Sequence, residues 1–186
     1  MEATSVRPGY ELWRPNREKA EAKTTKVVVA FVLLVSAALL LIITIGGWER
    51  LQGGTVGAVT IAWAALYVLF AFMVIRWSRG ILPVASALAV LMLIFAAVSA
   101  PGWFARDKEG LDSPIIPEEL IGLLVLLVIP IQLLLVAVAM FGFNQDWHVE
   151  EERPVGGEYE ADEAERYGDE EYEADRYRDR DDDPRR

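Results

Sequence analysis

Residues 118–147 read EELIGLLVLLVIPIQLLLVAVAMFGFNQDW. Within this stretch, residues 120–145 contain no Asp, Glu, Lys or Arg, and most of them are Leu, Val, Ile or Ala. These 26 uncharged residues exceed the roughly 20 that a helix needs to cross the hydrocarbon core of a bilayer. The stretch therefore predicts a transmembrane helix over residues 119–143, interrupted by Pro130 and Gln132.

Three more apolar runs precede this stretch, at residues 27–48, 53–75 and 81–100. Each is too long for a strand, so each predicts a membrane-spanning helix; a short polar turn follows the first two runs, and a longer loop, residues 105–117, follows the third. About 26 polar residues precede the first run, and we expect a retained anchor there rather than a cleaved signal peptide. The predicted fold class is an all-α membrane protein, with four transmembrane helices in an antiparallel bundle over residues 27–147.

The negative charge is concentrated at the end of the chain. The 186 residues carry a net charge of −10, and residues 144–186 alone hold 18 acidic and seven basic side chains. A segment with so few apolar residues and so much charge cannot bury enough surface to fold alone. Residues 148–186 are therefore predicted to form a disordered acidic tail, in which the motif EYEAD at 158–162 recurs at 171–175.

The distribution of Lys and Arg predicts the orientation in the membrane. Nine bases fall on one side of the four predicted spans and three on the other. The nine are the six bases of the polar segment 1–26, with Arg76, Arg79 and Arg153; the three are Arg50, Arg106 and Lys108. The positive-inside rule then predicts a cell-membrane protein with both termini in the cytoplasm.

Small and aromatic residues mark the expected packing faces and interfaces. Small residues allow helix backbones to approach closely in lipid, within one chain or between two copies. The predicted helix-packing residues are Gly53, Gly57, Ala58 and Ala62 in the second span and Ala85 and Ala89 in the third. The predicted interface anchors are Trp48, Trp77, Trp103 and Trp147, because tryptophan favours the boundary between lipid and water.

The sequence offers little material for catalysis. No predicted span has a charged residue in its interior, and the chain has no Cys and a single His. A hydroxyl without a nearby base is not a nucleophile, so we expect no enzyme, no cofactor and no metal site. Asp112, Glu118 and Glu119 are candidate cation ligands. Acidic residues at the start of a helix are favourable without a metal, and this is the preferred interpretation.

Pro130 and Gln132 are the remaining candidates. Proline removes one helical hydrogen bond and favours a kink, while Gln132 can form an interhelical hydrogen bond. The leading hypothesis is a non-catalytic accessory or scaffold subunit that contacts the lipid bilayer and a membrane-protein partner or a second copy. Its acidic tail would bind a basic cytoplasmic partner and not nucleic acid, whose phosphates require Lys and Arg. The alternative is a small channel or transporter whose pore is lined by Gln132 and the hydroxyls of the spans.

Overall fold

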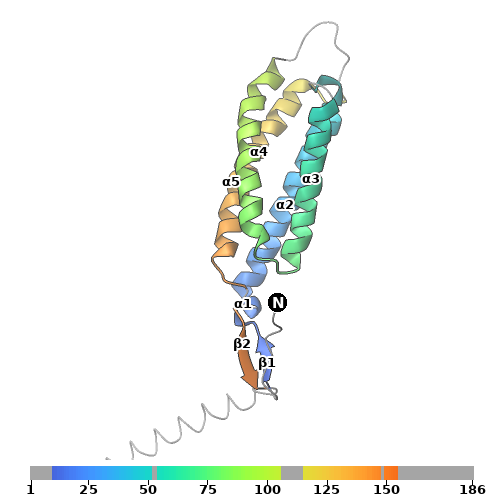
Figure 1. Ribbon diagram of the computed structural model, residues 1–186. Coiled ribbons are helices and arrows are strands. Elements are labelled where there is room, and N and C mark those ends of the chain that lie inside the picture. The colour runs from blue at the N-terminus through green and yellow to red at the C-terminus, as the bar shows by residue number, and fades with distance from the viewer. Residues whose placement is uncertain (1–9, 52–53, 106–114, 148, 155–186) are drawn as a thin grey trace, which may run out of the picture. The chain divides into compact units, whose positions relative to one another are not determined.

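The computed structural model describes residues 10–51, 54–105, 115–147 and 149–154. The chain is mostly helical and divides into two compact units, Pro15–Val149 and a second one formed by Met1–Arg14 with Glu150–Arg186. In chain order the elements are β1 (Tyr10–Trp13), α1 (Pro15–Glu18), α2 (Ala20–Gly46), the 3₁₀ turn η1 (Trp48–Arg50), α3 (Gly54–Ile75), α4 (Ile81–Phe104), α5 (Glu118–Phe143) and β2 (Glu151–Pro154), as Figure 1 shows.

Helices α2 to α5 confirm the four predicted spans. They contain 22 to 27 residues, and all four are long and apolar enough to cross a membrane. At a rise of about 1.5 Å per residue even the shortest reaches about 33 Å, against about 30 Å of hydrocarbon core. This is therefore a membrane-embedded protein. Helix α2 begins at Ala20, seven residues before the predicted span, because its first turns are polar and carry no hydrophobic signal.

The helices of the larger unit pack unequally. Helix α2 packs along α3 and α5, and α5 packs along α4, whereas α3 and α4 barely touch (Figure 1). The α4–α5 interface is close because α4 buries a row of alanines, which leave room for the facing helix. These alanines are Ala85, Ala89, Ala96 and Ala100.

Contacts between the ends of helices hold the connections in place. At one end, the backbone N–H of Ile116 donates to the carbonyl of Gly46 at 3.2 Å. A Cβ added at Gly46 would lie 2.4 Å from Cδ1 of Ile116, so the absence of a side chain is what admits this isoleucine. At the other end, Asn16 and Arg17 donate to the backbone carbonyls of Asp146 and Trp147.

Large apolar side chains cover the outside of the helices. Phe31, Phe95, Val98 and Phe141 are each more than half exposed. An exposed apolar surface of this extent promotes association in water, but it is the surface that hydrocarbon requires. The exposed apolar side chains therefore support the same conclusion as the length and composition of the helices, which is that these helices lie in a membrane.

The second unit departs from the all-α prediction. Strands β1 and β2 pair antiparallel, with Tyr10 opposite Pro154 and Trp13 opposite Glu151. The prediction was wrong here because both strands are short, and because β2 lies in an acidic run with little strand propensity. The rest of the predicted disordered tail, residues 155–186, lies outside the described residues, as do His148 and residues 106–114.

Candidate functional site

A chain of buried polar side chains links three of the spans. The Tyr67 hydroxyl of α3 donates to Oε1 of Gln132 at 2.8 Å, and Nε2 of Gln132 donates to Oγ of Ser36 at 3.2 Å. Ser36 in turn donates to the carbonyl of Val32 at 2.8 Å, within its own helix. Tyr67, Gln132 and Ser36 are all 1% exposed or less.

This chain lies near the middle of the helices that supply it. Gln132 is the fifteenth of 26 residues in α5, and Tyr67 the fourteenth of 22 in α3. No water reaches this depth in a bilayer, so polar groups here must find partners within the protein. Gln132 finds one partner for its oxygen and one for its nitrogen, and both belong to the same chain.

Pro130 lies within α5 two residues before Gln132, and the helix continues through it to Phe143. Proline lacks the N–H that would bond the carbonyl of Leu126, so this turn of the helix is short of one hydrogen bond. On α3, the buried indole nitrogen of Trp63 has no hydrogen-bond partner among the described residues.

The predicted helix-packing residues are placed on different faces. Gly57 is buried, and a Cβ added there would lie 2.4 Å from Cζ3 of Trp48, so this glycine makes room for a tryptophan of the same chain. Ala85 and Ala89 are fully buried within the helical unit. Ala58 and Ala62 are exposed on α3, and Gly53 lies outside the described residues.

The four predicted interface anchors differ in exposure. Trp48 is 44% exposed, whereas Trp103 and Trp147 are buried inside the protein. The rings of Trp77 and Trp147 meet edge to face with centroids 5.3 Å apart, and the Lys26 ammonium lies 4.0 Å from the centroid of Trp77. An ammonium over an indole face is an attractive contact, so these residues brace one end of the helical unit.

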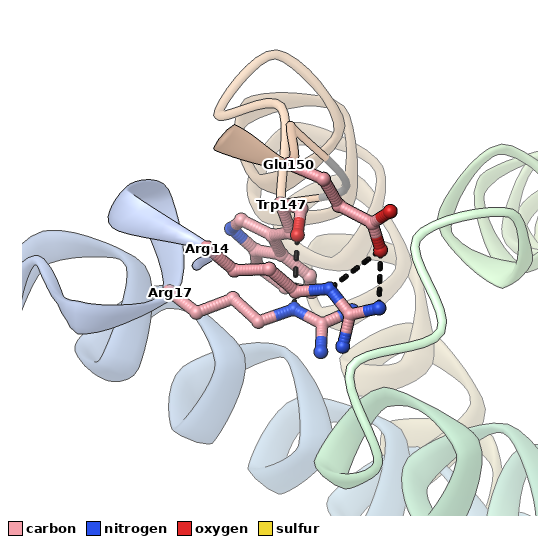
Figure 2. A network of polar contacts seen from close by, with 4 residues as sticks. All are labelled: Arg14, Arg17, Trp147 and Glu150. Atoms are coloured by element: carbon pink, nitrogen blue, oxygen red, sulfur yellow. Dashed lines mark hydrogen bonds and ion pairs between the residues drawn. The ribbon is translucent and has the colours of Figure 1, made fainter. Parts of the chain in front are cut away.

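Two arginines hold the turn that follows α5. Arg79 donates from Nε to the carbonyl of Phe143 at 2.8 Å and forms an ion pair with Asp146 at 2.6 Å. Arg17 donates from Nε to the carbonyl of Trp147 at 2.9 Å, as Figure 2 shows. The bond from Arg79 satisfies a carbonyl of the last turn of α5, which the end of a helix leaves without a partner, and the bond from Arg17 holds the segment that follows. Sequence reasoning had treated both arginines only as charges that set the topology.

Figure 2 also draws the Arg14–Glu150 pair of the smaller unit. Nε of Arg14 lies 2.8 Å from Oε1 of Glu150, and Nη2 bonds the same oxygen. Both side chains are about 40% exposed, 42% and 38%. Because water screens such a pair, its contribution to stability is small.

A pocket of about 620 Å³ lies between α3 and α4, which pack only loosely against each other. Its walls come from these two helices and its floor from α2 and α5. The lining is mainly apolar and includes Ile43, Val59, Trp63, Phe95, Trp103 and Val128. Sequence reasoning missed this pocket, because a poor fit between two helices leaves no trace in their composition.

The described residues contain no cluster of three or more metal-ligating side chains. Glu118, one of the candidate cation ligands, is buried at the start of α5, and Asp112 lies outside the described residues.

No protein-family model, curated protein or solved structure matches this chain.

Proposed function

We propose that this protein is a non-catalytic accessory or scaffold subunit of a membrane complex, with its four helices antiparallel in the bilayer. The observation that carries the proposal is that α3 has two faces of small residues. One face, with Gly57 and Ala64, is buried within the chain. The other, with Gly54, Ala58 and Ala62, is exposed.

The exposed small-residue face suits close approach by another helix. Gly54, Ala58 and Ala62 are spaced four residues apart, so they lie close to one line along α3. A Cβ added at Gly54 would meet nothing within 4 Å. Helix association in lipid relies on such close packing, because lipid tails are as apolar as leucine. The proposed occupant of this face is a helix of a partner protein or of a second copy.

The buried polar chain favours this role over a pore. Both polar atoms of the Gln132 side chain are engaged within the protein. The hydroxyls of Ser36, Thr44 and Thr60 each donate to the carbonyl four residues earlier in their own helix. Groups that are already paired within the protein have fewer hydrogen-bonding positions left for a passing ion or solute.

The proposed orientation places both termini in the cytoplasm, where the acidic tail would meet a basic partner. Its support is that Asn16 and Arg17 bond to Asp146 and Trp147, which brings the first and last residues of the helical unit to one end. Arg79, from the connection between α3 and α4, bonds at the same end. The positive-inside rule assigns an end this rich in arginine and lysine to the cytoplasm.

The test is purification in a mild detergent, followed by mass spectrometry of the intact assembly. The wild-type chain should carry a stoichiometric partner or form a defined homo-oligomer. The double variant Ala58→Leu, Ala62→Leu should lose it, because two leucines would hold the facing backbone away. The matched control is Ala87→Leu, which adds the same side chain at an exposed alanine of α4. A monomeric wild-type chain without a partner would refute the proposal.

A further inference from the structure

We infer that the pocket between α3 and α4 is a binding site for one acyl chain of a membrane lipid. This inference is independent of the proposed scaffold role, because the pocket and the exposed small-residue face involve different residues of α3. It rests on the lining of the pocket, its length along the helices and its volume.

The lining selects hydrocarbon. The floor is formed by residues such as Ile43 and Val128, and the walls by residues such as Val59 and Phe95. Three of the hydroxyls that reach the pocket, those of Thr44, Thr60 and Ser99, already donate to carbonyls of their own helices. With so few polar groups in the lining, a polar occupant would lose most of its hydrogen bonds, whereas an acyl chain has none to lose.

Aromatic residues delimit the pocket along the helices. The rings of Trp63 and Phe95 meet edge to face with centroids 6.0 Å apart and so bridge α3 and α4. Trp103 lines the pocket near the end of α4, and Leu51 lines it just before α3. The space thus runs from that end of the two helices towards their middle.

The length of the pocket matches one leaflet. The lining residues of α3 run from Thr55 to Trp63, and those of α4 from Met92 to Trp103. At a rise of about 1.5 Å per residue these stretches span about 12 Å and about 16 Å. One leaflet of the hydrocarbon core is about 15 Å thick. A chain that enters from the interface would therefore end near the Trp63–Phe95 pair, close to the middle of the bilayer.

The volume favours a flexible chain over a helix as the occupant. A helix with its side chains is about 10 Å wide, so 620 Å³ would hold only about 8 Å of its length, about five residues. The helix of a partner or of a second copy could only lie across the opening and leave the space beneath it empty. Lining atoms beside an empty space lose their dispersion contacts, which favours a flexible chain that fills it.

The experiment uses the full-length protein in vesicles of phosphatidylcholine whose acyl chain carries a photoreactive diazirine. After illumination, mass spectrometry locates the adducts on the chain. Adducts should concentrate on residues 55–63 of α3 and 92–103 of α4. In Val59→Trp, which fills the pocket from a side chain that is 55% exposed, their yield should fall about tenfold, because an overfilled cavity excludes the chain.

The matched control is Val90→Trp, at an exposed position of α4 that does not line the pocket. It should leave the pattern of adducts unchanged. Helical content by circular dichroism should be the same for both variants and the wild type, because neither valine is part of the core. Adducts spread evenly over the exposed faces of all four helices would overturn the inference. So would an unchanged yield in Val59→Trp, or a pocket covered by another protein chain and free of lipid adducts.

Discussion

Replacement of Gln132 by leucine tests whether the hydrogen bonds of the buried polar chain stabilise the packing of the helices. Leucine has nearly the same volume, so Gln132→Leu removes the amide without opening a cavity. It breaks the bond from the Tyr67 hydroxyl and the bond to Ser36. Ser36 keeps its bond to the carbonyl of Val32, but the Tyr67 hydroxyl is left at 0% exposure without its acceptor.

The magnitude follows from these two effects. Interhelical hydrogen bonds in membranes contribute about 0.6 kcal/mol on average and at most about 1.7. A buried donor without a partner costs about 1–3 kcal/mol more. Gln132→Leu should therefore lower the free energy of unfolding by about 2 kcal/mol. Adding Tyr67→Phe removes the stranded hydroxyl, so the double variant should regain about 1 kcal/mol.

The assay is unfolding in mixed micelles of a mild detergent and sodium dodecyl sulfate, followed by circular dichroism. Thr60→Val is the control, because this hydroxyl bonds only within its own helix and its loss should change stability by less than about 0.5 kcal/mol. The decisive comparison is between Gln132→Leu and the double variant. If the double variant is the less stable of the two, the hydroxyl was never stranded and the reasoning fails.

Three further predictions concern the ends of the helical unit and the smaller unit. Arg79→Gln should lower the free energy of unfolding by about 1–2 kcal/mol in the same assay, because it removes a charged donor to the end of α5. The control Arg76→Gln, at an exposed position, should lower it by less than about 0.5 kcal/mol. Equal losses in the two variants would refute this prediction. Gly57→Val should expel the tryptophan packed against it, seen as greater quenching of fluorescence by acrylamide, whereas Gly54→Val adds its side chain in open space and should have no effect. Glu150→Gln should change stability by no more than about 0.5 kcal/mol, since it breaks an exposed ion pair; a larger loss would mean that this pair holds the two strands together.

The four spans were predictable because length and lack of charge are properties of each segment alone. The ends of the spans were less predictable. Helix α2 begins at Ala20 and α4 extends to Phe104, and the polar or aromatic residues at these ends carry no strong hydrophobic signal. The spacing of glycines and alanines in α3 indicated that the helix has faces suited to packing. It did not indicate which face is buried in the chain, because that depends on the position of Trp48.

The candidate sites were harder to predict than the spans, because they depend on contacts between residues that are distant in the sequence. Gln132 was recognisable, since an amide within an apolar span needs a partner. Its partners were not: Tyr67, whose hydroxyl is the donor, lies 65 residues away in sequence. Strand β2 was missed for the same reason, because its partner strand lies at the other end of the chain and its own residues are charged. Pairing of this kind depends on topology rather than on local propensity.

The buried polar chain also bears on how the protein is made. Ribosomes synthesise the chain from its N-terminus, so Ser36 and Tyr67 enter the membrane before Gln132 exists. When α5 leaves the translocon, its amide carries unpaired polar groups into lipid, which favours docking against the helices already in place. Helix α4 supplies none of these three side chains, although it packs along α5. The hydrogen bonds of Gln132 therefore cannot form until α5, the last of the four long helices in chain order, has entered the bilayer.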